Sequence, residues 1–152
     1  AGIMHMEGAE AIDPACDALY LWHAAGLRSL GPVWSRPTAF GHGVPFAFPS
    51  SPDTGPGLTE AGKRLVKVCN ALKIMVDLSH VGAQTSEEAI LASTKPVCYS
   101  HCLPAGLKPH PRNKSDAQLR EIADAGGFVG VTMFAPFLKR GIDATVEVRT
   151  PR

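Results

Sequence analysis

The sequence predicts an α/β fold of alternating strands and helices, a partial (β/α)8 (TIM) barrel of about five strands and four helices. Apolar runs suited to buried strands alternate with segments of helical spacing, and parallel strands need such crossover helices. No glycine-rich phosphate turn follows the first strand, which disfavours a dinucleotide-binding sheet. Polar residues follow three strands at their carboxyl ends, where barrel enzymes carry their chemistry. A closed barrel takes about 250 residues, so 152 residues supply part of one.

The first half of the chain predicts two strands, one helix and a long loop. Residues 2–6 form a short apolar run that ends at Glu7. Residues 12–25 carry apolar side chains at helical spacing, and residues 27–34 predict a second strand. Residues 35–57 hold too many prolines and glycines for either periodicity. Such a length is uncommon for a loop unless it is functional or disordered, and its three phenylalanines indicate a loop that packs against the scaffold.

Two helices and a strand follow the loop. Thr59 is a suitable N-cap for a helix over 59–72, which has an apolar face. Residues 74–79 predict a buried strand that ends at His80. The helix predicted over 85–93 opens with a hydroxyl residue followed three positions later by Glu, the pattern of a capping box.

The last part of the chain repeats this alternation. Residues 96–100 predict a strand that ends at His101. Residues 115–118 form a second capping box, and the glycines at 126–127 predict the end of its helix. Residues 128–133 predict the fifth strand.

Composition excludes several classes of protein. Lys and Arg number 15 against 14 Asp and Glu, a net charge of +1, which gives no field to attract nucleic acid. No apolar run approaches the roughly 20 residues that cross a bilayer. The four cysteines form no CxxC pair, which predicts buried thiols in a reducing compartment. With no signal peptide in this sequence, we expect a cytoplasmic location.

Three residues at equivalent strand ends form the candidate metal site: Glu7, His80 and His101. Two neutral imidazoles and a carboxylate are a common zinc ligand set that leaves a position for water. The alternative for each histidine is a strand-end side chain that hydrogen-bonds to backbone. Asp77, within the segment VDLSH, is expected to hydrogen-bond to neighbours of the site, because a buried carboxylate needs partners.

Two further residues have competing interpretations. Arg112 follows the strand of His101 in an irregular loop, where it could clamp a carboxylate with two hydrogen bonds or lie on the solvated surface. His5 shares a strand face with Glu7, so it is either an additional polar residue of the sheet interior or a core histidine.

Six separated motifs lie along the chain: MEGAEAI (6–12), GLTEAGKRLVKVCN (57–70), VDLSHVG (76–82), YSH (99–101), HPRN (110–113) and GGFVGV (126–131). In this order they resemble the membrane (renal or microsomal) dipeptidases, the dizinc peptidase family M19, and in particular a bacterial branch. The resemblance implies a (β/α)8 metal-dependent hydrolase barrel with two zinc ions, and hydrolysis of dipeptides.

The resemblance also implies a role for each matching residue. Glu7 would bridge both metals and is the candidate catalytic residue, while His80 and His101 would complete the second zinc site. Arg112 would hold the carboxylate of the dipeptide substrate. Trp34 stands where many relatives carry a substrate-binding histidine, so it is the second candidate substrate contact.

Parts of the family pattern have no counterpart in this sequence. No His-x-Asp pair precedes Glu7, and the catalytic Asp of a later strand would follow Arg152. We therefore expect residues 1–147 to be a central part of the barrel, residues 148–152 to be an off-pattern tail, and the chain alone to be inactive. Two alternatives remain: another metal-dependent amide or lactone hydrolase of the same fold, or a non-catalytic truncated chain. A homodimer is a further possible assembly.

Overall fold

Five parallel strands follow one another in chain order in the computed structural model, which describes residues 2–138. One sheet has the order β1-β2-β3, and β4 pairs with β5 in a second sheet. A parallel bridge between Asp77 and Cys98 connects β3 to β4. The strands are β1 (Met4–Glu7), β2 (Leu27–Gly31), β3 (Met75–Val76), β4 (Cys98–Cys102) and β5 (Phe128–Val131).

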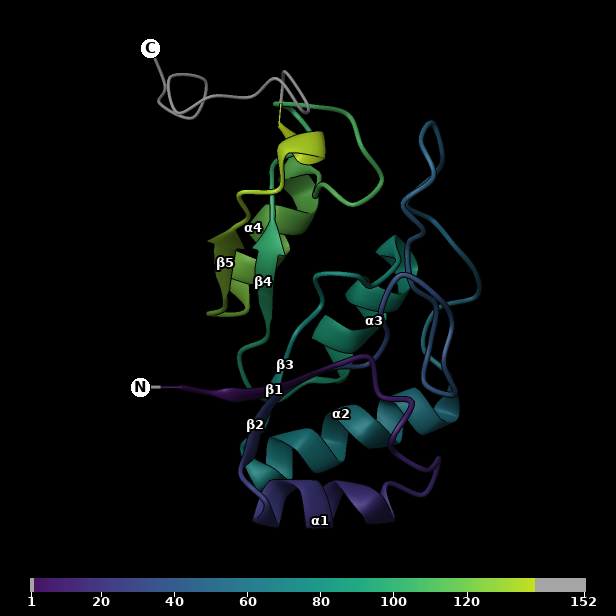
Figure 1. The fold of residues 1–152 in the computed structure, drawn as a ribbon, viewed down its shortest axis with the longest axis vertical. Helices are drawn as coiled ribbons and strands as arrows, with labels where there is room; N and C mark the ends of the chain where they lie inside the picture. The colour runs from purple at the N-terminus through teal and green to yellow at the C-terminus, as the bar shows by residue number, and fades with distance from the viewer. Residues whose placement is uncertain (1, 139–152) are drawn as a thin grey trace.

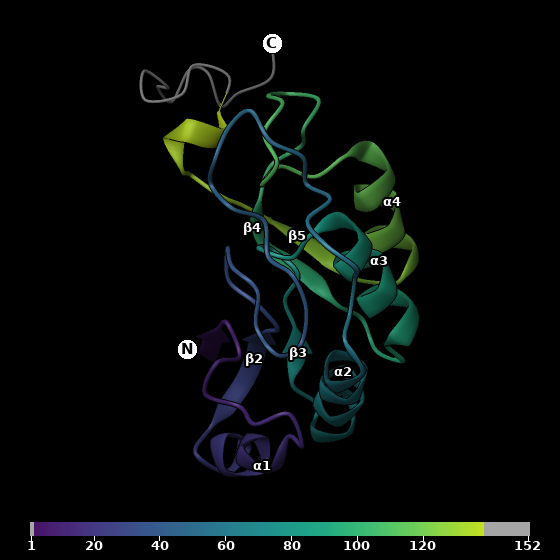
Figure 2. The ribbon, with the colours of Figure 1, turned by 90° about the vertical axis from the view of Figure 1, so that its right-hand side faces the viewer.

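Four helices connect these strands and lie along one side of them, in chain order (Figure 2). A doubly wound sheet reverses its strand order at a switch point, whereas the strands here keep chain order as an arc of a barrel does. The arc does not close within residues 2–138. The helices are α1 (Asp17–Ala24), α2 (Glu60–Leu72), α3 (Ala83–Ala92) and α4 (Asp116–Asp124), followed by a short 3-10 helix, η1 (Ala135–Phe137).

The apolar core combines side chains of the strands with those of the helices that cover them. Leu30 of β2 and Val76 of β3 are buried together with Leu19 of α1 and Val66 of α2. Burial of each such side chain contributes about 1.5–3 kcal/mol. The helices therefore hold the strands in place, and the carboxyl ends of the parallel strands all lie at one edge.

Two of the predicted helix caps are confirmed. The Thr59 hydroxyl accepts the Gly62 N–H at the start of α2. At the start of α4, Ser115 and Gln118 form the predicted capping box with reciprocal hydrogen bonds. Gly126 follows α4 with φ of 71°, a left-handed conformation that glycine adopts without strain.

Two predicted helix starts are wrong. The first helix begins at Asp17 and not at residue 12, because Cys16 has a positive φ and the Asp13 carboxylate accepts the first free N–H groups. The third begins at Ala83 rather than at the predicted capping box, and its N-terminal amide donates to the Pro52 carbonyl. Glu88 of that box instead accepts the N–H of Leu58, near the start of α2.

The strand ends also differ from the sequence prediction. The second strand ends at Gly31 instead of residue 34, and the third contains only Met75 and Val76 as regular ladder residues. His101 lies within β4 rather than after it. The tail at 148–152 lies outside the described residues. No helix among those residues has the length and apolar character that a membrane span needs.

The long loop after β2 packs against the scaffold, as predicted, and runs beside the β3–α3 connection (Figures 1 and 2). Gly43 forms an antiparallel bridge with Val81, and Val44 donates its N–H to the His80 carbonyl. Phe40 is fully buried, whereas Phe46 remains 42% exposed. The loop therefore holds the segment that carries His80 and presents an aromatic side chain near it.

Candidate metal centre

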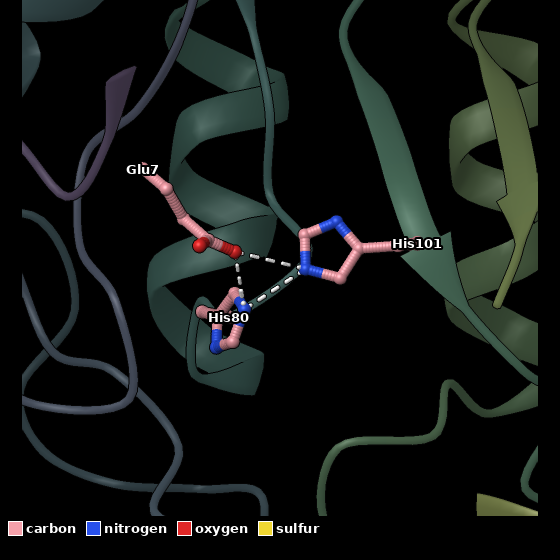
Figure 3. Close-up of side chains that lie close together, drawn as sticks. All are labelled: Glu7, His80 and His101. Carbon is pink, nitrogen blue, oxygen red and sulfur yellow. Dashed lines mark hydrogen bonds and ion pairs between the residues drawn. The ribbon is translucent and has the colours of Figure 1, made fainter. Parts of the chain in front are cut away.

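Glu7, His80 and His101 converge from three separate elements (Figure 3). Glu7 ends β1, His80 lies in the turn after β3, and His101 lies on β4. The Glu7 Oε1 atom is 2.8 Å from His80 Nε2 and 3.1 Å from His101 Nε2. The two Nε2 atoms are 2.9 Å apart. The structure thus brings together the three residues that the sequence predicted as metal ligands.

The chemistry of this donor set fits a divalent cation. Two imidazole nitrogens and a carboxylate oxygen face one point, and a cation there would satisfy all three lone pairs. Burial, then the nearby Arg112 and His101, lower the pKa of His80 to about 3. His80 is therefore neutral at physiological pH, the protonation state in which imidazole binds a metal.

The other ring nitrogen of each histidine meets a serine hydroxyl. Ser35 Oγ is 2.8 Å from His80 Nδ1, and Ser100 Oγ is 2.7 Å from His101 Nδ1. Such partners fix the orientation of a ligating imidazole ring. The sequence analysis did not single out either serine; the position of Ser100 beside His101 was a visible signal, but Ser35 is 45 residues from its partner.

Asp77 is buried and hydrogen-bonds to neighbours of His101, as the sequence analysis expected. Its Oδ1 atom accepts the Ser79 N–H at 3.0 Å, the Ser79 hydroxyl at 2.6 Å and the Ser100 N–H at 3.0 Å. Its Oδ2 atom accepts the Ser100 hydroxyl. Burial alone would raise the pKa of Asp77, but the hydrogen bonds from Ser100 and Ser79 outweigh it and lower the pKa.

Arg112 is buried near the metal-ligand candidates and not on the solvated surface. Only 1% of the residue is exposed, and its Nε and Nη1 atoms have no hydrogen-bond partner within the described part of the chain. Burial lowers the pKa of Arg112 to about 10, which leaves the guanidinium charged at neutral pH. A buried cation with unpaired N–H groups is suited to bind an anion.

Aromatic rings connect this guanidinium to the metal-ligand candidates. The Phe46 ring centre is 6.0 Å from the Arg112 guanidinium carbon and 6.1 Å from the centre of the His80 ring. The Trp34 ring lies 5.5 Å from His80 and 5.4 Å from Phe46. Phe137 of η1 lies 5.6 Å from the same guanidinium carbon. Sequence reasoning identified Trp34 but not these two phenylalanines, which come from a loop and a short helix without a motif.

His5 is not part of the cluster of Glu7, His80 and His101. Its Nδ1 atom is 2.9 Å from Ser29 Oγ, and its Nε2 atom is 3.7 Å from Asp77 Oδ2. About 30% of the His5 side chain is exposed. It is therefore a polar residue of the inner sheet face and not a core histidine.

Comparison with known proteins identifies the family. The sequence profile of membrane dipeptidase, peptidase family M19, matches residues 1–149. The chain belongs to this family. A solved metallopeptidase from Rhodobacter sphaeroides, bound to a phosphinate mimic of the dipeptide L-Ala-D-Ala, is 53% identical with a TM-score of 0.90. That match covers 94% of this chain and 41% of the other.

Two further proteins are similar to this chain. A solved structure described as dipeptidase AC, a metallopeptidase of family M19, is 55% identical with a TM-score of 0.89, covering 92% of this chain and 41% of that one. A Klebsiella pneumoniae protein from the pqqA 5′ region is 45% identical over 139 residues, 91% of this chain and 51% of the relative. The chain therefore spans about half the length of this curated relative.

Proposed function

We propose that this M19 chain supplies one half of the active centre of a zinc-dependent dipeptidase. The observation that carries the proposal is the convergence of Glu7, His80 and His101 within 3.1 Å of one another. Beside them lies the buried guanidinium of Arg112, whose Nε and Nη1 atoms have no partner among residues 2–138. Family membership and the dipeptide mimic bound by the Rhodobacter sphaeroides relative support the same reaction.

Each group has a defined task in peptide hydrolysis. Zinc held by these residues would polarise the scissile carbonyl and lower the pKa of water. Glu7, His80 and His101 would hold the metal, with Glu7 as the carboxylate shared with a second ion. Arg112 would bind the carboxylate of the dipeptide with two hydrogen bonds, a geometry that its planar fork favours.

The aromatic side chains would define the space between these two groups. The Phe46 ring centre lies 6.0 Å from the Arg112 guanidinium carbon and 6.1 Å from the centre of the His80 ring, so a substrate held by both groups would lie against this ring. Phe46 and Phe137 would also lower the local dielectric around an Arg112–carboxylate pair and so strengthen the pair.

Turnover is proposed to require residues beyond this chain. The chain covers 41% of the solved M19 structures, and the His-x-Asp pair and catalytic Asp of the family pattern are not in its sequence. We expect the chain alone to bind one zinc ion weakly and to show no turnover of L-Ala-D-Ala. The same chain extended with the flanking barrel segments of an M19 relative should hydrolyse it.

Substitutions in the extended protein would test the roles separately. His80→Ala and His101→Ala should each lose bound zinc and turnover, whereas His23→Ala on α1 should retain both. Arg112→Ala should keep its zinc but bind the phosphinate mimic more weakly by about 2–5 kcal/mol, and the exposed Arg120→Ala serves as its control. Loss of zinc without loss of ligand affinity in Arg112→Ala would contradict the proposed clamp.

A different substrate for the same metal site is the second candidate. Fold and metal ligands alone do not select between a dipeptide and another amide or a lactone. The Nε and Nη1 groups of Arg112, which have no partner in the described part of the chain, favour a substrate with a free carboxylate. Faster turnover of an uncharged amide or a lactone than of L-Ala-D-Ala would support the alternative, and no turnover by any extended protein would support a non-catalytic chain.

A further inference from the structure

The hydrogen bonds of Asp77 define where the Ser100 hydroxyl sends its proton. The Asp77 carboxylate receives two backbone N–H groups on its Oδ1 atom, from Ser79 and Ser100. Backbone N–H groups can only donate, so Oδ1 must accept. The Ser100 hydroxyl donates its single proton to the other oxygen, Oδ2.

The Ser100 hydroxyl therefore has no proton left for the histidine. Its oxygen lies 2.7 Å from His101 Nδ1, and a hydroxyl that donates elsewhere can only accept at this contact. His101 must then carry its proton on Nδ1 when the ring is neutral. Its Nε2 lone pair is left free and points toward Glu7 and His80 (Figure 3).

We propose that Asp77 and Ser100 are positioning residues that hold His101 in its Nδ1–H tautomer, so that Nε2 is ready to bind a metal. The effect on metal binding rests on the proposed function, whereas the tautomer does not. The tautomer of His80 is not fixed in this way, because its partner Ser35 has no second hydrogen-bond partner within residues 2–138 that would set the direction of its hydroxyl proton. The paired segments VDLSH and VCYSH thus have unequal roles in spite of their similar sequences.

Asp77→Asn reverses the direction of these hydrogen bonds with little change in shape. The backbone N–H groups of Ser79 and Ser100 require the amide oxygen at the Oδ1 position. The amide NH2 then faces Ser100 and donates to its hydroxyl, which is left to donate to His101 Nδ1 at 2.7 Å rather than to the more distant Ser79 hydroxyl at 3.2 Å. A hydroxyl that donates to Nδ1 holds the ring in the Nε2–H tautomer, which cannot bind a metal through Nε2.

The tautomer can be read directly in the metal-free full chain. Long-range 1H–15N NMR correlations at about pH 8, above the ordinary pKa of imidazole, distinguish the two ring nitrogens. The His101 signals are assigned by their loss in His101→Ala. We expect Nδ1–H in the parent chain and Nε2–H in Asp77→Asn. A parent His101 in the Nε2–H form would overturn the proposal.

Zinc affinity provides the second readout, by competition with a chelator on the same full chains. Asp77→Asn should bind Zn2+ 10–100-fold more weakly than the parent, the usual effect of losing such a partner. Ser79→Ala is the matched control, since the Ser79 hydroxyl contacts Asp77, the His101 N–H and, at 3.2 Å, the Ser100 hydroxyl, but not Nδ1. It should keep the Nδ1–H tautomer, and a tautomer change there equal to that of Asp77→Asn would also overturn the proposal.

Ser100→Ala keeps the test decisive if Asp77→Asn fails to fold. Removing the hydroxyl removes the acceptor at Nδ1, so His101 should populate both tautomers, and zinc affinity should fall by a smaller factor. A pure Nδ1–H signal in Ser100→Ala would show that another group fixes the ring. If His101→Ala leaves zinc affinity unchanged while the tautomer results hold, the proposed metal site fails and the tautomer assignment stands.

Discussion

Replacing Lys114 with methionine should stabilise the chain at pH 7, because Lys114 is a buried lysine with no anionic partner among residues 2–138. The residue is 2% exposed, and its ammonium group donates to the Val81 carbonyl at 3.1 Å. It lies 4.6 Å from the centre of the Tyr99 ring. No carboxylate among residues 2–138 forms an ion pair with it. Burial, and secondly the charge of Arg112, lower the pKa of Lys114 from 10.5 to about 7.

The magnitude follows from the linkage between protonation and folding. The unfolded chain binds the Lys114 proton up to pH 10.5 and the folded chain only up to about pH 7, so stability rises with pH between these values. At 1.36 kcal/mol per pH unit, the depressed pKa costs the parent roughly 4 kcal/mol at pH 7. Methionine removes this cost and loses about 1 kcal/mol for the hydrogen bond to Val81. The advantage of Lys114→Met should shrink by about 2 kcal/mol between pH 7 and pH 8.5.

Urea unfolding at pH 7.0 and 8.5 measures this difference directly. Comparing parent and variant at each pH cancels the other titrating groups, including the buried cysteines. Lys67→Met, on the exposed face of α2, is the control and should show a difference from the parent that does not vary with pH. A Lys114→Met chain that is less stable than the parent at both pH values, with a constant gap, would refute the reasoning.

Three further predictions concern the scaffold. Ser115→Ala should lower the free energy of unfolding by about 1 kcal/mol, measured in urea, because it removes the capping box of α4; an unchanged midpoint would show that the box is not stabilising. Gly62→Ala should destabilise the chain despite the better helix propensity of alanine, since its Cβ would collide with the Phe40 carbonyl oxygen; a higher melting temperature would contradict this packing. The four buried thiols, Cys69 among them with a pKa raised to about 12 by burial, should react with a disulfide reagent only after unfolding; rapid labelling of the native chain would count against their burial.

Much of the fold could be predicted from local sequence patterns. Helical spacing over 59–72 and the cap at Thr59 depend on residues a few positions apart, and both are confirmed. The start of α3 could not be predicted, because the carbonyl of Pro52 from the long loop accepts the N–H of Ala83 and replaces the local capping box. A partner distant in the chain thus overrode a correct-looking local signal.

The candidate site divides in the same way. The sequence by itself determined which residues face the carboxyl edge, because a donor that ends each strand, such as Glu7, must project there in any parallel arrangement. It also supplied Arg112, but not its burial or its unpaired N–H groups. Only the tertiary structure decided that Ser35 meets His80 across 45 residues and that the Phe46 ring lies near both His80 and Arg112. The physical reason is that the path of the long loop is set by packing and hydrogen bonds to distant segments, which no local periodicity records.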